Sequence, residues 1–169
     1  RAAGDPETAA GLLAEALGLW RGPALADHAD ASFAAPAIAR WEEQRTGAVE
    51  DHMEARLDQG EDASLIGELD ELVGRYPLRE RLRAVHMRAL YRAGRQAEAL
   101  ADYRRFRALL AEEIGVDPGP ELSRLHQDML AQSPGLAAAA PNERGRLPEP
   151  ETGRAPEPPP SNLPALLPE

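Results

Sequence analysis

The chain has 169 residues, of which 43% are hydrophobic, 28% charged and 4% aromatic, and its formal net charge at pH 7 is −10. The absence of cysteine excludes disulfides, zinc–thiolate sites and thiol nucleophiles, and no apolar run approaches the roughly 20 residues of a membrane span. All 19 basic residues are arginine, and the acidic average argues against non-specific nucleic-acid binding by the chain as a whole. Without a signal-type apolar stretch at its N-terminus, we expect a cytoplasmic protein with no membrane partner.

Residues 1–133 are predicted to be all-α, because Ala, Leu, Glu and Arg dominate while β-branched and aromatic residues are rare. Asp5-Pro6-Glu7 has the residue types of a helix start, and apolar residues follow at helical spacing as far as Trp20. Gly22-Pro23 ends this first helix. The other expected helices span 36–57, 62–75, 79–93, 95–114 and, from an opening at 118–121, a last short helix to 130.

Residues 134–169 differ in composition from the rest of the chain. This segment holds ten of the 16 prolines and few large apolar residues. Such a sequence buries too little apolar surface to offset the entropy cost of ordering. We therefore expect a disordered Pro-rich linker that is extended by its polyproline bias. A Pro-rich ligand for an SH3-like partner is the alternative.

An internal repeat emerges when the chain is aligned with itself at a shift of 34 residues. In each copy a glycine is followed by apolar residues at positions +5, +9 and +12. The glycine permits a tight turn between two antiparallel helices, and the apolar positions face neighbouring helices. A helix pair with a period of about 34 residues is typical of tetratricopeptide repeats. The leading positions of the three copies are Gly4, Ala9 and Leu13; Gly60, Leu65 and Leu69; and Gly94, Ala99 and Tyr103.

The first copy departs from this pattern in two ways. Gly4 and Gly60 lie 56 residues apart, so about 22 extra residues fit an insertion around Trp20 to Trp41. The first copy also has only its second helix, and we expect the partner helix upstream of Arg1, because each repeat needs a neighbour to bury its apolar face. Trp20 and Trp41, which flank the insertion, are expected to be core anchors.

Acidic and basic residues occupy different parts of the chain. Residues 42–71 hold eleven acids and two arginines, whereas residues 75–107 hold ten arginines and three acids. One interpretation is internal, with facing helices joined by salt bridges. The other is a basic face for DNA or for an acidic protein. The arginines that we expect to be exposed for partner contact are Arg79, Arg81, Arg83, Arg104, Arg105 and Arg107.

No arrangement of catalytic, cofactor-binding or metal-binding residues is found in the sequence. It lacks glycine-rich phosphate loops, a GxSxG elbow and an HExxH zinc motif. His52 and His86 are 34 residues apart and so occupy equivalent repeat positions, which favours packing or solvation over metal ligation. We therefore predict a protein that is not an enzyme and has no catalytic residue, no cofactor and no metal.

Five motifs, in this order, resemble a known family. They span Leu19–Asp27, Arg40–Arg45, Pro77–Leu82, Ala89–Tyr103 and Glu112–Leu122. Together they resemble the bacterial transcriptional activator domain of the Streptomyces antibiotic regulatory proteins, a group that includes AfsR-like regulators. The resemblance covers about residues 4–131, and the family domain begins with a helix before the Gly4 turn, in agreement with the missing helix of the first repeat.

The resemblance implies a regulatory, protein-interaction domain of a transcriptional activator. Such a domain supports an upstream winged helix-turn-helix module that reads promoter DNA, and it contacts itself, DNA or RNA polymerase. The expected partners are therefore that module, promoter DNA indirectly, RNA polymerase and a second copy on DNA. In AfsR-like members a Pro-rich linker leads to a nucleotide-binding domain, and the run at 162–165 looks like its beginning.

The alternative is a general tetratricopeptide scaffold that binds a peptide partner and has no tie to transcription. A groove lined by Asn, Lys and Arg would favour this function, because those side chains hold a terminal carboxylate. The chain has no lysine, and its two asparagines, Asn142 and Asn162, lie in the tail. These observations count against the scaffold.

Overall fold

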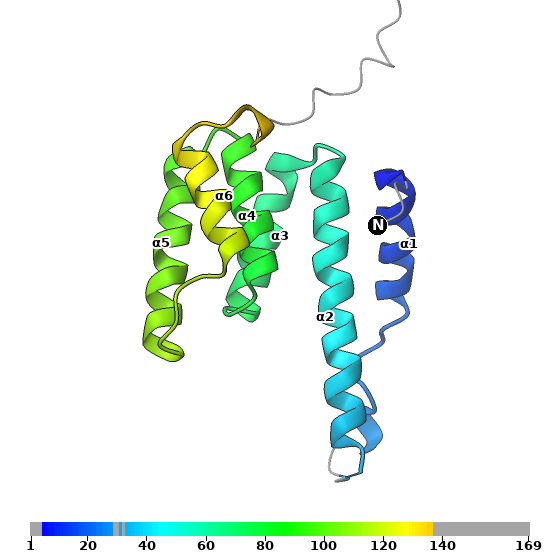
Figure 1. The fold of residues 1–169 in the computed structure, drawn as a ribbon. Helices are drawn as coiled ribbons and strands as arrows, with labels where there is room; N and C mark the ends of the chain where they lie inside the picture. The colour runs from blue at the N-terminus through cyan, green and yellow to red at the C-terminus, as the bar shows by residue number, and fades with distance from the viewer. Residues whose placement is uncertain (1–4, 29–30, 32, 137–169) are drawn as a thin grey trace, which may run out of the picture.

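The computed structural model describes residues 5–28, 31 and 33–136, and within them the fold is entirely helical (Figure 1). The predicted all-α class of antiparallel helix pairs is confirmed, and the predicted helix ends lie within two residues of the observed ones. None of the helices in this part of the chain is long and apolar enough to span a membrane. The elements are α1 (Pro6–Gly18), η1 (Ala26–His28), α2 (Ala35–Asp58), α3 (Asp62–Arg75), α4 (Glu80–Arg92), α5 (Gln96–Glu113), α6 (Pro120–Leu130) and η2 (Pro134–Leu136), where η marks a single 3-10 turn.

The chain reverses between paired helices at two of the repeat glycines. Gly60 and Gly94 have φ angles of 86° and 77°, in the left-handed region that a side chain disfavours. After α2, the Gly60 N–H donates to the carbonyl of Leu57 and the Glu61 N–H donates to the carbonyl of Arg56. The turn after α4 repeats both bonds. This Schellman arrangement satisfies the last carbonyls of a helix while it redirects the chain.

The main hydrophobic core is formed by the five helices from α2 to α6. Leu65, Leu69 and Ala99, the apolar repeat positions on α3 and α5, are fully buried, and Tyr103 is half-buried. On α1 the corresponding Ala9 and Leu13 are also only half-buried. The reason is that α1 packs chiefly on α2 and lies at one end of the row of helices (Figure 1).

The expected insertion forms a projecting arm. We use this name for residues 19–28, 31 and 33–45. The helix α2 has 24 residues, against 14 for α3, and at about 1.5 Å per residue its N-terminal part extends well beyond the other helices (Figure 1). The segment that follows α1 runs alongside this extension (Figure 1), and Ala34, just before α2, is buried. The arm is thus an addition to the regular row of helix pairs.

The described chain ends in η2, whose Leu136 packs against the core. The ordered fold therefore continues three residues beyond the expected boundary at 133. The prediction of a disordered Pro-rich tail otherwise falls on residues 137–169, which lie outside the described residues, as do Arg1 and Gly4.

The start of α6 is capped from a different helix. Gly119 is the residue before α6, and its N–H donates to both carboxylate oxygens of Glu80 on α4, each at 3.0 Å. No side chain next to Gly119 in sequence caps this helix end. A Cβ added to Gly119 would lie 2.7 Å from Glu80 Oε2, so the contact also needs glycine there. The Glu80 carboxylate on α4 therefore connects the start of α6 to the rest of the fold by hydrogen bonds.

We predict that Glu80→Ala lowers the free energy of unfolding by about 1 kcal/mol, because the helix loses its capping acceptor. Urea denaturation followed by circular dichroism measures this change. Glu112→Ala is the matched control, since Glu112 is exposed on α5 and has no ion pair among the described residues. Equal stability of the two variants would show that the contact does not hold α6.

Candidate interaction surfaces

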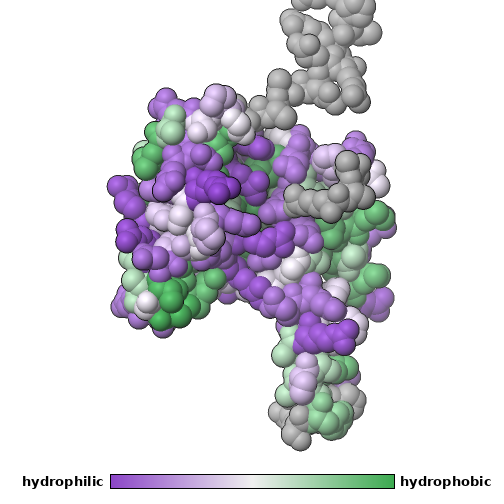
Figure 2. All heavy atoms as spheres, viewed as in Figure 1, coloured by the Kyte–Doolittle hydropathy of each residue, from purple (hydrophilic) through white to green (hydrophobic). Residues whose placement is uncertain are grey.

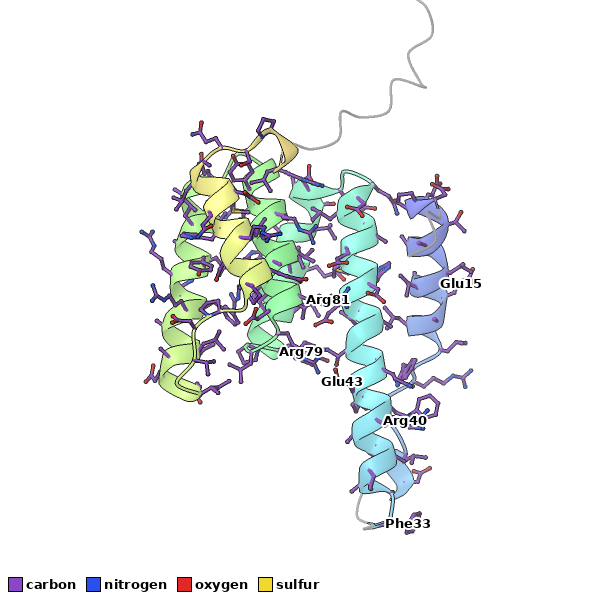
Figure 3. All side chains as sticks on the ribbon, in the orientation of Figure 1. Glu15, Phe33, Arg40, Glu43, Arg79 and Arg81 are labelled. Atoms are coloured by element: carbon purple, nitrogen blue, oxygen red, sulfur yellow. The ribbon has the colours of Figure 1, made fainter. Side chains whose placement is uncertain are left out.

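The basic and acidic parts of the chain face one another across α2 and α4. Arg79 Nη1 donates to Glu43 Oε1 at 2.7 Å, and its second terminal nitrogen also bonds this carboxylate. This hydrogen bond and the charge of Arg79 lower the pKa of Glu43. Figure 3 shows Arg79 and Arg81 extending from α4 towards α2. Arg81 bonds three acids of α2 at 2.6–3.2 Å, namely Glu50, Asp51 and Glu54.

A buried carboxylate joins α4 to α5. Asp102 is 1% exposed; its Oδ1 accepts bonds from Arg83 Nη1 at 2.8 Å and from Arg105 Nη2 at 2.9 Å. Its Oδ2 is hydrogen-bonded to His86 Nδ1 at 3.1 Å. The other ring nitrogen, His86 Nε2, lies 3.2 Å from Asp70 Oδ1 on α3, but this second contact does not have hydrogen-bond geometry. Burial alone would raise the pKa of Asp102, but the bond with His86 and the charge of Arg83 lower it overall. The carboxylate is therefore held in its charged form.

Asp102 is one of three acids in the basic segment, and no role was predicted for it. The signal was available, because a lone acid within a run of arginines on a helix is a candidate partner for a neighbouring arginine. The sequence could not show that the side chain is buried. His86 was expected to be a packing or solvated residue, and the structure makes it a buried neighbour of this acid.

Two of the six arginines that we expected to be exposed are not. Arg83 is 9% exposed, because its guanidinium pairs with Asp102 and lies 5.2 Å from the centre of the Phe106 ring. Arg79 is half-buried against α2. The other four are exposed: Arg81, Arg104, Arg105 and Arg107. Of these, only Arg104 has no ion pair among the described residues.

The basic segment thus serves mainly internal salt bridges. Arg105 bonds Asp102, and Arg107 Nε donates to Asp117 Oδ1 at 2.8 Å. Both side chains keep more than half of their surface exposed, at 66% and 61%. The interpretation that facing helices are joined by salt bridges therefore describes α2, α4 and α5 well. The helix with the most exposed arginine side chains is α5.

The arm carries an open hollow of about 680 Å³ lined by residues 19–27 and by Trp41. Trp20 packs edge-on against Trp41, with ring centres 6.4 Å apart. The expectation that both tryptophans are core anchors is wrong, because Trp41 is 47% exposed and the pair lies outside the main core. They belong to the insertion, which no second layer of described helices covers.

A second, smaller hollow of about 320 Å³ lies between α2, α4 and α6. Two arginines line it, but both pair with acids of α2: Arg81 as described above, and Arg88 with Glu54 at 3.5 Å. The floor contains Leu122 and Leu125. A terminal carboxylate of a peptide would have to compete with these internal partners for either arginine.

Two histidines sit in contacts between helices. Burial lowers the pKa of His52 on α2, and the charge of Arg56 lowers it further. His126 on α6 stacks on Tyr103 of α5 with ring centres 3.9 Å apart, and burial, together with the charge of Arg104, lowers its pKa. In the part of the chain that the structure describes, no group of His, Asp or Glu side chains is arranged to hold a metal ion.

The family model described as the bacterial transcriptional activator domain matches residues 1–130. The chain belongs to this family. It is 46% identical over 132 residues to the transcriptional regulator RedD of Streptomyces coelicolor, and 48% identical over 140 residues to the regulatory protein AfsR of Streptomyces griseus. A solved structure of Mycobacterium tuberculosis EmbR, in complex with a low affinity phosphopeptide, shares the fold with a TM-score of 0.74 and 37% identity.

These comparisons confirm the resemblance to the Streptomyces antibiotic regulatory proteins and place the chain among transcriptional regulators. The matches cover 78% of this chain but 38% of RedD, and 83% of this chain but 14% of AfsR. The EmbR match covers 76% of this chain and 34% of that one. The chain therefore corresponds to one part of longer regulators.

We predict that Asp102→Ala lowers the free energy of unfolding by about 3 kcal/mol, because it leaves the buried Arg83 guanidinium without its counter-charge. Chemical denaturation measures the loss. Asp117→Ala is the matched control, since it removes the acid of an exposed pair, and such pairs contribute at most about 1 kcal/mol. Similar losses in both variants would mean that the Asp102 cluster contributes no more than a surface pair.

We predict that the fold loses stability as the pH falls from about 7.5 to about 5.5. In this range the unfolded chain takes up protons at the ordinary histidine pKa of 6.5, whereas folded His52 and His126 resist protonation. Unfolding free energies measured across the range test this, and the double variant His52→Gln, His126→Gln is expected to have a shallower pH dependence. An unchanged slope in the double variant would contradict the assignment.

Proposed function

We propose that the chain is the regulatory, protein-interaction domain of a cytoplasmic transcriptional activator, and that it supports a winged helix-turn-helix module placed upstream. Its family membership supports the transcriptional role. The observation that supports the docked module is the open outer side of α1. Leu12 is 62% exposed there, and Ala16, one turn further along, is exposed as well.

A helix that is apolar on two sides needs a neighbour on each of them. The inner side of α1 packs on α2, and Figure 2 shows hydrophobic residues gathered on its outer side. In the proposed arrangement, the segment that leads from the winged-helix module covers this outer side and completes the first helix pair. Promoter DNA is then contacted by that module and reaches this domain indirectly.

The accessible arginines of α5 support a second part of the proposal. Arg104, Arg105 and Arg107 lie on one helix, and all three are exposed. We assign them to contact with RNA polymerase or with a second copy of the regulator bound to DNA. Arg79, Arg81 and Arg83 act instead by holding α4 to its neighbours. A nucleotide-binding domain beyond the Pro-rich segment remains part of the proposal for the longer protein.

The general peptide-binding scaffold is the weaker candidate. Its groove would be lined by α2, α4 and α6, and the two arginines of that hollow already pair with acids of α2. The groove thus offers no cation that is unbound and ready for a peptide carboxylate.

We predict that this chain alone does not bind promoter DNA, whereas a chain extended through its native upstream sequence binds with a preference for one promoter. Fluorescence anisotropy at two salt concentrations measures both. In the extended chain, Arg104→Glu combined with Arg107→Glu is expected to lower transcription in vitro at least several-fold while DNA affinity is kept. Glu112→Gln, on the same helix, is the control.

Three results would contradict the proposal in different ways. If neither version binds DNA, the scaffold becomes the better assignment. If this chain alone binds and loses affinity steeply with salt, its arginines contact phosphate directly. If the α5 variant activates transcription normally, the polymerase or second-copy contact lies elsewhere on the molecule.

A further inference from the structure

We propose that the arm is a docking site for an acidic, amphipathic helix of a partner protein. The apolar side chains of that helix would enter the hollow lined by residues 19–27 and Trp41, and its carboxylates would pair with Arg21 and Arg40. This surface is separate from the outer side of α1 and from the arginines of α5.

The arm exposes more large apolar side chains than any other part of the described fold. Leu19 and Phe33 are 80% and 79% exposed, and Leu25 and Trp41 are nearly half exposed. Figure 2 shows hydrophobic residues over the arm, and Figure 3 places Phe33 at its free end. Exposed apolar patches of this kind mark sites of association, and tryptophan is among the residues that contribute most to binding at interfaces.

The hollow is held in shape by specific contacts. The Ala24 N–H donates to Glu42 Oε1 of α2 at 2.9 Å, which fastens the loop to the helix. Leu25 adopts a φ of 51°, which is unusual for a residue with a side chain and turns the loop at this point. The edge-to-face tryptophan pair closes one side. The apolar wall is therefore preformed, which lowers the entropy cost of binding.

The charges beside the hollow select an acidic partner. Arg21 lines it, and Arg40 lies on the same projecting part of α2 (Figure 3). Both are exposed, and neither has an ion pair with another described residue. Asp27 is the one acid among the residues that line the hollow. Most arginines of α4 and α5, in contrast, are bound to acids.

The size of the apolar surface favours a protein segment over a small molecule. Phe33 is apolar and highly exposed, yet it does not line the hollow. A ligand confined to the hollow would leave this residue in water, whereas a helix laid along the arm would cover both. An amphipathic helix in a groove presents its anchors one turn apart and its charges at the margins, which matches an apolar hollow with arginines beside it.

Intrinsic tryptophan fluorescence tests the proposal without a label, because the chain has two tryptophans and both are in the arm. The probe is a synthetic helical peptide with Leu and Phe on one face and Glu at the margins. A matched peptide carries Lys in place of each Glu. We expect a saturable blue shift with the Glu peptide and at least ten-fold weaker binding of the Lys peptide.

Variants separate the charge from the apolar contribution. The double variant Arg21→Glu, Arg40→Glu is expected to bind the Lys peptide better than the Glu peptide. Phe33→Ser is expected to weaken the Glu peptide several-fold and to leave the fold unchanged, because Phe33 is exposed. Arg124→Glu, on exposed surface of α6, is the control and keeps the affinity of the unmodified chain. Circular dichroism of each variant confirms that the helices are intact.

Four outcomes would overturn the proposal. Equal binding of the two peptides would remove the role of the arginines, and no saturable change with either would remove the site. A blue shift that grows with protein concentration alone would show that a second copy covers the arm. A chain extended upstream whose tryptophans are already shielded and insensitive to the Glu peptide would show that the regulator covers the arm with its own residues.

Discussion

The carboxylate of Asp102 is the interaction on which the packing of the last two repeats depends. It lies within α5 and is fully buried. It accepts hydrogen bonds from Arg83 of α4 and from Arg105 of its own helix, and it also bonds His86. A charge in that position is tolerated because each oxygen is matched by a donor. The apolar residues around it then set the spacing of α3, α4 and α5. The same ionic joining is repeated outside the core, where Arg79 and Arg81 fix α4 to α2.

This use of arginine has a consequence for function. In a chain with ten arginines over residues 75–107, a basic surface would be the simple expectation. Most of them are paired with acids of α2, α3, α5 or the segment after α5, so the electrostatic field of the basic segment is largely cancelled within the fold. Among the arginines that stay exposed are a short row on α5 and the two arginines of the arm. Partner binding is therefore expected at a few defined places.

The family gives these places a context. The chain belongs to the bacterial transcriptional activator domain and corresponds to one part of longer regulators. A row of helix pairs is suited to such a position, because each added pair extends the surface without altering the core of the others. The arm interrupts this regularity between α1 and α2. An addition of this kind costs little stability in the repeats, and it offers a surface that the repeats do not have.

The sequence by itself determined the helices and their turns. The 34-residue period and the glycines at 60 and 94 predicted where the chain reverses, because only a left-handed residue allows the hydrogen-bond pattern of those turns. The excess spacing likewise located the insertion. Tertiary structure decided which charged side chains form ion pairs inside the fold. Arg83 and Arg105 belong to the same basic segment and both bond Asp102, yet one is buried and the other is exposed. It also decided that Trp20 and Trp41 form an open hollow, since burial depends on which helices lie beside a side chain, and local sequence does not record those neighbours.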